Sequence, residues 1–405
     1  MSYSNQFYKA LNINPESKEE ISLASKKSCV STTNLNYYND KNIVPSGLDL
    51  ENIEKYFNIS ELELMVKMGR LDQVIIDAIQ LNSDKLIKLI ESDYNKAKSS
   101  VDFGMSEMVF ESKYGKLFEG DCLDVMSRIK SDSVDLVFAD PPFNLAKLYP
   151  SKMDDSIKAE KYLSWSEKWM SECIRILKPG GAFFTWNIPL WNSKLSGYLH
   201  GRLNFRHWIA TDIKYSLPIQ GRLYPSHYSL LYFVKGEKPN TFKADRLAMD
   251  VCPKCFGDLK DYGGYKHKMN PKGISLTDVW LDIPPVRHAK YKKREGSNEL
   301  SIKLLDRIIE MVTVEGDLVF DPFGGAGTTY VVAEMKKRNW IGSELGPCDV
   351  IVDRFKQINE ERGYLEKLRG DINDIFPPKI KIERQKRNLW TYESEQLRKM
   401  KTAIK

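Results

Sequence analysis

Apolar and polar residues follow two different patterns along the chain, and the first has the period of a helix. Over residues 50–98, apolar positions recur at spacings of three and four, which predicts two or three amphipathic helices. Residues 1–50 are polar and only weakly periodic, which predicts loop or loosely ordered chain. We therefore expect residues 1–105 to form a mostly helical appendage that serves packing or dimerisation.

The second pattern begins at residue 114, where short apolar runs alternate with amphipathic stretches. This alternation predicts strands and helices in turn, and it is typical of a parallel, doubly wound α/β sheet. The expected strands are residues 116–119, 134–139, 182–186, 227–234, 317–320 and 340–344, and the expected helices are residues 122–129, 154–177, 299–312 and 327–337.

The α/β pattern does not continue over residues 239–294, which therefore divide the predicted sheet into two halves. We expect the first half in residues 106–238, the insert in residues 239–294, the second half in residues 295–375 and a tail in residues 376–405. The insert has 12 basic and 6 acidic residues, and the tail has nine and three, against a net charge of +6 for the whole chain. Two basic blocks on a nearly neutral to acidic core are typical of binding to a polyanion.

Composition excludes several classes of protein. The 405 residues are 42% hydrophobic and 29% charged, which is ordinary for a globular chain and excludes wholesale disorder. The apolar runs are too short to span a bilayer, and residues 1–20 lack the apolar centre of a secretory signal. Six scattered cysteines do not make a disulfide framework, so we expect a cytoplasmic protein.

One pair of cysteines, Cys252 and Cys255, has half the spacing of a zinc ribbon. A second pair is missing, and although His267 could supply a third ligand, a structural zinc site usually has four. We therefore expect two reduced thiols here and no bound metal.

A glycine-rich segment follows the predicted strand 317–320 and opens the next predicted helix. It reads Asp321-Pro322-Phe323-Gly324-Gly325-Ala326-Gly327-Thr328-Thr329. Glycines at such a turn let the backbone approach a ligand closely, although the segment has neither the dinucleotide spacing nor the lysine of a P-loop. Glu344 closes the next strand, where a carboxylate suits a ribose diol. Together these features favour a ligand site over a plain turn.

A second motif, Asp140-Pro141-Pro142-Phe143, directly follows the predicted strand 134–139. The two prolines remove backbone donors, which leaves carbonyl oxygens and the aspartate carboxylate as acceptors at the carboxyl edge of the sheet. Phe143 adds an aromatic face beside them. Acceptors next to a stacking face predict a pocket for the exocyclic amine of a planar base.

These two motifs together resemble those of the S-adenosylmethionine-dependent DNA amino-methyltransferases, over residues from about 116 to 362. Because the catalytic motif precedes a long insert and then the cofactor motif, the order resembles the β-type arrangement. The resemblance implies a circularly permuted, Rossmann-like methyltransferase sheet with an inserted target-recognition region and an N-terminal helical appendage. It implies a cofactor site made by Asp121, Asp140, Ser297, Asn298, Asp321, Pro322, Phe323, Gly324, Gly325, Gly327, Thr328 and Glu344.

The activity that the resemblance implies is methyl transfer from S-adenosylmethionine to an exocyclic nitrogen in double-stranded DNA. Asp140 and the Pro141 carbonyl would accept hydrogen bonds from the amine and stabilise its growing positive charge, while Phe143 stacks on the flipped base. The Pro347-Cys348 pair lies on the cofactor side, so Cys348 is interpreted as an ordinary thiol.

The Asp at position 140 resembles the adenine-N6 type, whereas cytosine-N4 enzymes mostly have Ser there, and Phe143 replaces the commoner Tyr. We therefore expect an adenine-specific enzyme that serves as the modification half of a restriction–modification system. A cytosine-N4 enzyme and a catalytically silent DNA-binding relative are the alternatives.

DNA contacts are expected from the insert, which lies where β-type enzymes have their target-recognition region. Basic and aromatic residues interleave there, which suits phosphate contacts and base-edge readout. The expected residues are Lys260, Tyr262, Lys266, Arg287, His288, Lys292, Lys293 and Arg294. In the tail, Arg384, Lys386 and Arg387 cluster without a clear period, so a phosphate-binding helix and a solvated end both remain open. A homodimer and a cognate restriction endonuclease are compatible partners, and a membrane is not expected.

Overall fold

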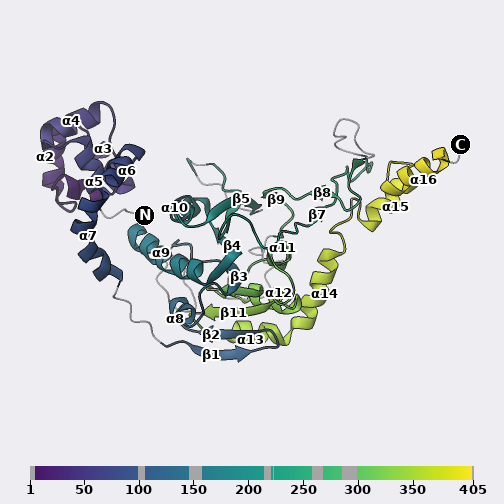
Figure 1. The fold of residues 1–405 in the computed structure, drawn as a ribbon. Helices are drawn as coiled ribbons and strands as arrows, with labels where there is room; N and C mark the ends of the chain where they lie inside the picture. Colours follow the sequence, from purple (N-terminus) through teal and green to yellow (C-terminus); the bar gives the residue numbers. More distant parts are fainter. Residues whose placement is uncertain are drawn as a thin grey trace. The chain divides into compact units, whose positions relative to one another are not determined.

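The computed structural model describes residues 5–98, 105–145, 157–213, 220–221, 223–257, 268–284 and 299–403 (Figure 1). The chain divides into two compact units, one of residues 1–103 with 156–166 and the other of residues 104–155 with 167–405. None of the helices in the described residues is long and apolar enough to cross a membrane.

The first unit is a bundle of short helices. They are α1 (Gln6–Ala10), α2 (Lys18–Ser28), α3 (Thr32–Lys41), α4 (Leu48–Phe57), α5 (Glu61–Lys67), α6 (Gln73–Leu81) and α7 (Ser83–Lys98). The prediction of helices over residues 50–98 is confirmed, although the structure has four (α4 to α7) instead of two or three. The prediction of loop for residues 1–50 is wrong. The reason is that the polar residues which suggest loop are helix caps: Ser17 and Ser31 accept backbone N–H groups at two helix starts, and Asn42 ends α3 in the left-handed conformation.

The second unit is built on a nine-stranded sheet. Its strands are β1 (Glu107–Glu111), β2 (Gly115–Glu119), β3 (Val134–Ala139), β4 (Leu177–Asn187), β5 (Asn204–Asp212), β6 (His227–Val234), β9 (Val279–Trp280), β10 (Leu318–Asp321) and β11 (Asn339–Glu344). They lie in the order β1-β2-β11-β10-β3-β4-β6-β5-β9. The predicted parallel sheet is confirmed for the five strands β2, β11, β10, β3 and β4. In contrast, β1 pairs antiparallel with β2, and β6 pairs antiparallel with both β4 and β5.

The strand order is that of a permuted sheet, because β10 and β11 come late in the chain yet lie between β2 and β3. The glycine-rich turn after β10 is thereby placed next to the Asp-Pro-Pro motif after β3, although they are far apart in sequence. β4 begins earlier than predicted, since Gly180 within the Pro-Gly-Gly turn still donates a backbone hydrogen bond to Lys235.

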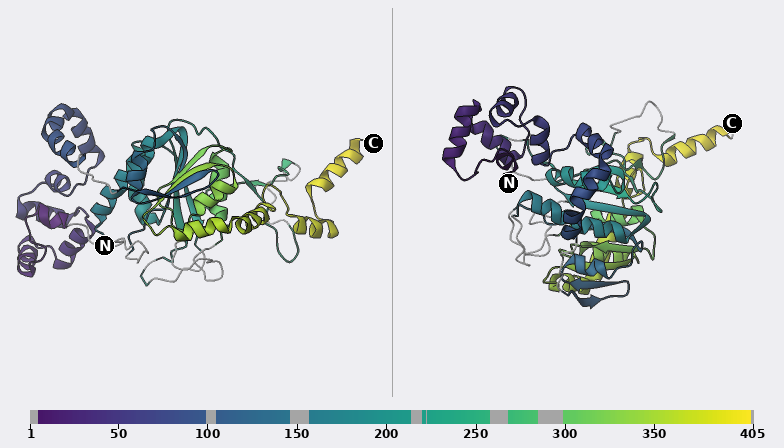
Figure 2. Two further views of the ribbon diagram at one scale, coloured as in Figure 1. Left: turned by 90° about the horizontal axis from the view of Figure 1, so that it is seen from below. Right: turned by 60° about the vertical axis from the view of Figure 1, so that its left-hand side comes forward.

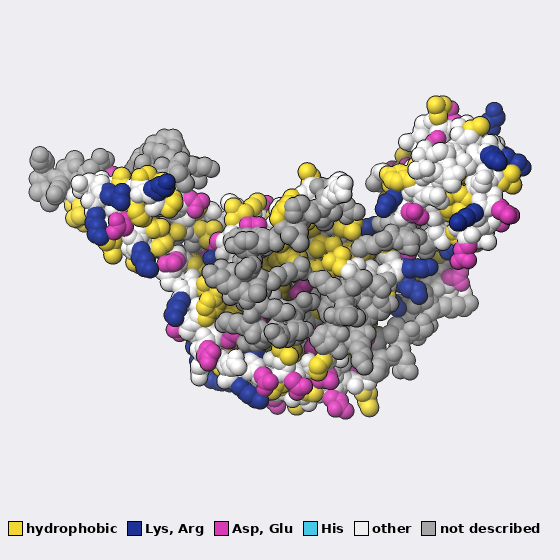
Figure 3. Space-filling model, turned by 180° about the vertical axis from the view of Figure 1, so that it is seen from behind, with side chains coloured by type: hydrophobic (Ala, Val, Ile, Leu, Met, Phe, Trp, Pro, Cys, Tyr) yellow, Lys and Arg dark blue, Asp and Glu magenta, His cyan; other side chains and the backbone are white. Residues whose placement is uncertain are grey.

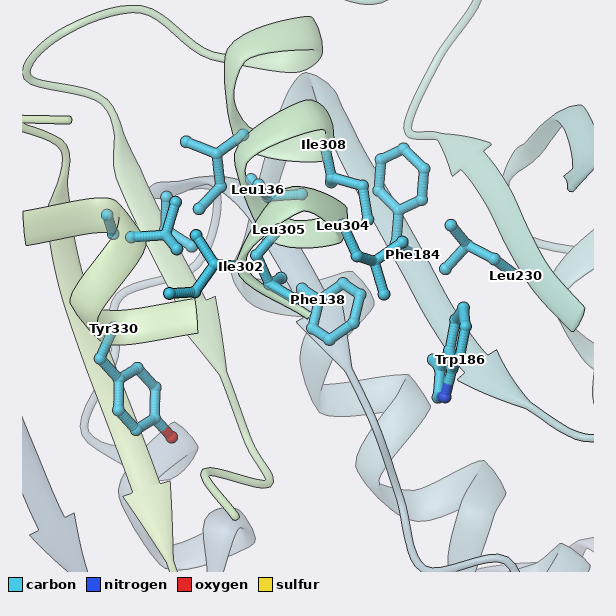
Figure 4. Packing of buried hydrophobic residues seen from close by; sticks show 14 of the residues in the cluster. Leu136, Phe138, Phe184, Trp186, Leu230, Ile302, Leu304, Leu305, Ile308 and Tyr330 are labelled. Atoms are coloured by element: carbon cyan, nitrogen blue, oxygen red, sulfur yellow. The ribbon is translucent and has the colours of Figure 1, made fainter. Parts of the chain in front are cut away.

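Helices cover both sides of this sheet, as Figure 2 shows. They are α8 (Cys122–Ser127), α9 (Ala159–Ile176), α10 (Pro189–His200), α11 (Ile302–Val312), α12 (Thr328–Met335), α13 (Asp349–Lys356) and α14 (Ile358–Arg369). In the core, Leu304 and Ile308 of α11 lie against Phe138 of β3, Phe184 of β4 and Leu230 of β6, all buried (Figure 4). This apolar contact fixes the helix that follows the insert onto the middle of the sheet.

The insert is fastened to α11 at both of its ends. At its start, Arg369 pairs with Asp245 and with Asp306 of α11. At its end, Asp282 pairs with both Lys303 and Arg307 of the same helix. Burial alone would raise the pKa of Asp282, but these two cations outweigh it and hold that pKa well below its usual range.

Between these anchors lies a small sheet of β7 (Arg246–Leu247) and β8 (Ile274–Ser275), and β9 joins the main sheet beside β5. The predicted tail forms two helices, α15 (Pro378–Lys386) and α16 (Tyr392–Ala403).

Candidate active site

Four neighbouring strands place an acidic residue at the carboxyl edge of the sheet. Glu119 ends β2, Glu344 ends β11 and Asp321 ends β10, while Asp140 directly follows β3. These strands are adjacent and parallel, so the four carboxylates line one edge, where open α/β sheets bind ligands. This alignment is the central feature of the site.

Asp321 organises the start of the glycine-rich turn from within the fold. It is buried, and its two carboxylate oxygens accept from the Phe323 backbone N–H (2.9 Å) and from the Thr329 hydroxyl (2.5 Å). Burial raises the pKa of Asp321 well above its usual range, and the nearby charges of Asp140 and Glu344 add to that rise. The predicted cofactor residue thus holds together the two ends of the turn.

The glycines of the turn are required by its backbone. Gly325 (φ 53°) and Gly327 (φ 71°) have left-handed conformations, and a Cβ on Gly327 would lie 2.7 Å from Ile351 Cγ2. Gly327 is also the N-cap of α12, so the first N–H groups of that helix follow directly on the turn. The missing Cβ of Gly327 therefore lets the turn pack closely against α13.

Glu344 joins the turn to the neighbouring strand, because its Oε2 accepts the Gly325 backbone N–H at 2.7 Å. Burial raises the pKa of Glu344, against hydrogen bonds from backbone N–H groups that lower it. The carboxylate is therefore held in place beside the glycine-rich turn, as its predicted role toward a ribose diol requires.

Tyr330 supports this edge and was not predicted. Its hydroxyl lies 3.0 Å from the carbonyl oxygens of both Asp321 and Ser343, and so bridges the ends of β10 and β11. Its ring fills the space above Gly342, where an added Cβ would lie 2.3 Å from Cζ. A glycine within an apolar strand is a sequence signal of such close packing.

Behind the turn lies a fully buried arginine, Arg354 of α13, which was also not predicted. It donates to the Ala326 carbonyl (3.0 Å) and the Thr328 hydroxyl (2.7 Å), both in the glycine-rich turn. The buried carboxylates of Glu299 and Glu361 lie 3.5 and 3.4 Å from the same guanidinium. Arg354 thus links the cofactor turn to α13 and α14.

The Asp-Pro-Pro-Phe motif, for which a catalytic role is predicted, lies at the end of β3, where Asp140 is half-buried and Phe143 is buried. The Phe143 carbonyl accepts the Trp191 indole N–H at 2.7 Å, and its ring centroid is 5.9 Å from that of Tyr228. The ring centroid of Tyr228 in turn lies 4.9 Å from that of Trp186. Sequence reasoning identified Phe143 alone, but the structure adds an aromatic cluster of Phe143, Trp186, Trp191 and Tyr228.

The remaining predicted residues fall into two groups. Asp121 is described: it is the N-cap of α8, and its Oδ1 accepts the Leu123 backbone N–H at 2.8 Å. Phe323 lies edge-on to Trp169, with ring centroids 5.2 Å apart. Outside the described residues lie Ser297, Asn298 and all the predicted DNA contacts, namely Lys260, Tyr262, Lys266, Arg287, His288, Lys292, Lys293 and Arg294.

The thiols differ in their environments. Burial raises the pKa of Cys348, and the charge of Glu119 raises it further, so this thiol is protonated and a poor nucleophile. The pKa of Cys252 is lowered by backbone N–H groups of Cys255 and Lys254. Within the part of the chain that the structure describes, no three His, Cys, Asp or Glu side chains are grouped so that they could hold a metal ion.

Comparison with known proteins assigns the family. Residues 134–351 match the family model N6_N4_Mtase, described as DNA methylase. The chain is 47% identical over 363 residues to the Type II methyltransferase M.BamHI of Bacillus amyloliquefaciens, a match that covers 89% of this chain and 85% of that protein. It is 27% identical to the Type II methyltransferase M.HpaI of Haemophilus parainfluenzae, over 66% of this chain and 82% of the relative.

Another relative is the DNA adenine methyltransferase YhdJ of Escherichia coli (strain K12), 28% identical over 58% of this chain and 80% of that protein. The solved structure of the PvuII DNA methyltransferase (cytosine-N4-specific) aligns with a TM-score of 0.46 at 18% identity, over 65% of this chain and 95% of that one. By the family match and the extended similarity to M.BamHI, the chain belongs to the DNA methylase family and is an S-adenosylmethionine-dependent DNA amino-methyltransferase.

Proposed function

We propose that this enzyme methylates N6 of adenine at a specific site in double-stranded DNA, as the modification enzyme of a restriction–modification system. The observation that carries the proposal is the alignment of Asp140, Asp321 and Glu344 on three adjacent strands. Because they share one edge of the sheet, a base held at Asp140 would meet a cofactor held at the glycine-rich turn.

The cofactor half of the site suits S-adenosylmethionine in both charge and shape. Glu344, fixed by Gly325, would accept from the ribose hydroxyls, and the left-handed glycines leave room for the backbone to approach the ligand. Carboxylates along the edge favour a ligand that carries a sulfonium and an ammonium group. When bound, S-adenosylmethionine would supply the electrophilic methyl group.

The catalytic half acts on the amine of the base. Asp140 and the Pro141 carbonyl would accept hydrogen bonds from the NH2 group, which turns the nitrogen lone pair out of conjugation with the ring. The nitrogen then forms the new bond to the methyl carbon as the carbon–sulfur bond breaks. Asp140 stabilises the positive charge on nitrogen until a proton leaves. Pro142, which follows, restricts the backbone that presents these acceptors.

The aromatic cluster around Phe143 supplies the apolar wall of this half. Phe143 and Tyr228 are both buried, with Trp191 holding the Phe143 carbonyl. A flipped base that enters next to them would stack against aromatic rings and lose contact with water.

The residues at positions 140 and 143 indicate which base is methylated. Asp at position 140 favours adenine N6, whereas Phe143 departs from the commoner Tyr, and the same acceptors fit the N4 amine of cytosine. Cytosine N4 is therefore the second candidate.

Sequencing of modified bases tests this choice. The enzyme should be expressed in a host that lacks DNA methylation, and the genomic DNA read by long-read sequencing that identifies modified bases. N6-methyladenine at one recurring sequence is expected, while N4-methylcytosine as the sole product would contradict the adenine assignment. The same recurring sequence, if resistant to a restriction endonuclease encoded nearby, would support the restriction–modification role.

Cofactor binding should depend on pH through Glu344. Because burial raises its pKa above the ordinary 4.5, the carboxylate loses its charge at a higher pH than an exposed glutamate. The KM for S-adenosylmethionine should therefore rise as pH falls through that raised pKa. Glu344→Gln should increase this KM roughly 10- to 100-fold at neutral pH and flatten the profile, as steady-state kinetics from pH 5 to 8 would show. An unchanged profile in the variant would assign the titration to another group.

A further inference from the structure

The tail packs onto the insert, although the 81 residues 295–375 separate them in sequence. Met249 of the insert is buried together with Ile375, the residue before the tail, and Phe376, its first residue. Ile380 and Trp390 of the tail pack against them. The Met249 backbone N–H also donates to the Ile375 carbonyl at 2.9 Å. The two basic blocks of the sequence are therefore one structural module.

Arg384 holds the parts of this module together. It is fully buried, and it donates to the Trp390 carbonyl through Nε (3.0 Å) and Nη2 (2.7 Å) and to the Phe256 carbonyl through Nη1. Its guanidinium lies 4.2 Å from the centre of the Phe376 ring. The arginine thus joins α15, the approach to α16 and the insert turn at residues 252–257, and it has a structural role.

The neighbouring cations remain at the surface. Lys386 and Arg387 at the end of α15 and Lys254 on the insert turn are exposed, and the Arg387 guanidinium lies 5.0 Å from the Phe256 ring centre. Lys386 forms an exposed ion pair with Glu383, in which Nζ lies 2.8 Å from Oε1. An exposed pair of this kind contributes little to the stability of the fold, so it does little to hold Lys386 away from another anion. We call these three cations the tail surface. Figure 3 shows Lys and Arg side chains spread over this end of the molecule, at its left.

The position of the tail surface indicates which part of a DNA duplex could reach it. In Figures 1 and 2, α15 and α16 extend away from the sheet. A duplex whose target base lies at Asp140 would therefore meet these helices beyond the target.

We propose that the tail surface binds the phosphate backbone of DNA that flanks the methylated site. This inference rests on the proposed function for the duplex itself, but assigns the contact to the C-terminal helices as well as to the insert. Cations presented by two packed segments suit a regularly spaced row of phosphates, which they bind without regard to sequence.

The test compares Lys386→Glu/Arg387→Glu with a matched control in the full-length enzyme. Lys356→Glu is that control, because Lys356 is exposed and pairs with Asp353 three residues before it at 2.7 Å, just as Lys386 pairs with Glu383. Methylation kinetics are measured on a duplex trimmed to the mapped target and on the same target with long flanks, over a range of salt concentrations.

On the long duplex, the double variant should have a KM for DNA raised roughly 10-fold, and the slope of log affinity against log salt should fall by about 2. On the trimmed duplex its KM should equal that of the wild type, and kcat should be unchanged on both. Lys356→Glu should match the wild type throughout. Equal KM values for the double variant and the wild type on the long duplex would overturn the inference.

The outcomes separate this inference from the proposed function. If the wild type methylates neither duplex, the proposed function fails. If it methylates both and the double variant behaves as the control does, the tail surface is only a solvated end. A double variant that weakens on both duplexes equally would place the contact at the target rather than in the flanks, and would also contradict the inference.

Discussion

Replacing Asp140 with asparagine should lower kcat for methyl transfer by about 10²- to 10³-fold. The amide is nearly the same size but has no charge, so it cannot stabilise the positive charge that grows on the attacking nitrogen. Asp140 follows β3, two strands away from the Glu344 that ends β11, so the affinity for S-adenosylmethionine should stay close to that of the wild type. Single-turnover transfer and calorimetric cofactor titration measure the two quantities separately.

Asp132→Asn provides the control for this substitution. Asp132 precedes β3 at its opposite end, is exposed, and has a left-handed backbone (φ 55°) that asparagine adopts readily. Its activity should therefore be normal. If Asp140→Asn lost cofactor binding as well as transfer, the residue would belong to the cofactor site, as the shared edge with Asp321 and Glu344 would allow.

Removing the guanidinium of Arg354 should have the largest effect on stability. In Arg354→Met, the buried carboxylates of Glu299 and Glu361 would lose their counter-charge, and the Ala326 carbonyl would lose its donor. Breaking a buried ion pair from one side costs about 3–5 kcal/mol, which urea denaturation would report as a lower midpoint with an unchanged slope.

A second substitution distinguishes lost charge balance from lost packing. Arg354→Met/Glu361→Met removes the guanidinium together with one of its two carboxylate partners, so it should be more stable than Arg354→Met alone. Arg362→Met, at an exposed arginine of α14, should change the free energy of unfolding by less than about 0.5 kcal/mol. If the double variant were less stable than the single one, the buried carboxylate would not be the source of the loss.

The Asp140–Phe143 motif and the glycine-rich segment are visible in the sequence because each is local. A strand of consecutive apolar residues is recognisable without its neighbours, so β3 and β6 have the bounds that the pattern predicts. Asp140 directly follows such a strand, and Glu344 is the last residue of β11. Family resemblance then supplied the permuted order, which the positions of β10 and β11 between β2 and β3 confirm.

The alignment of four carboxylates was not predictable, because it depends on which strands are neighbours. Glu119 reads as an ordinary end of a strand until β2 is seen to lie beside β11. Tyr330 and Arg354 act through partners that are distant in sequence or on the next helix, so no spacing reveals them. Their roles follow from packing alone.

Charge clusters were the least reliable guide to function. Arg384 has the same charge as Lys386 and Arg387 and stands beside them in sequence, yet it is buried and holds the fold together. The polar N-terminal residues misled in a similar way, since serine and asparagine cap helices as readily as they form loops. In both cases the tertiary environment, rather than the residue type, decides the role.

We propose that this sheet edge brings a methyl donor to the exocyclic amine of a DNA base. The most direct measurement is transfer of a radiolabelled methyl group from S-adenosylmethionine to duplex DNA, followed by digestion to nucleosides and chromatography. We expect label in a nucleoside methylated on its exocyclic nitrogen, and a rate of labelling about 10²- to 10³-fold lower with Asp140→Asn. Label in 5-methylcytosine, or transfer by Asp140→Asn at the wild-type rate, would contradict it.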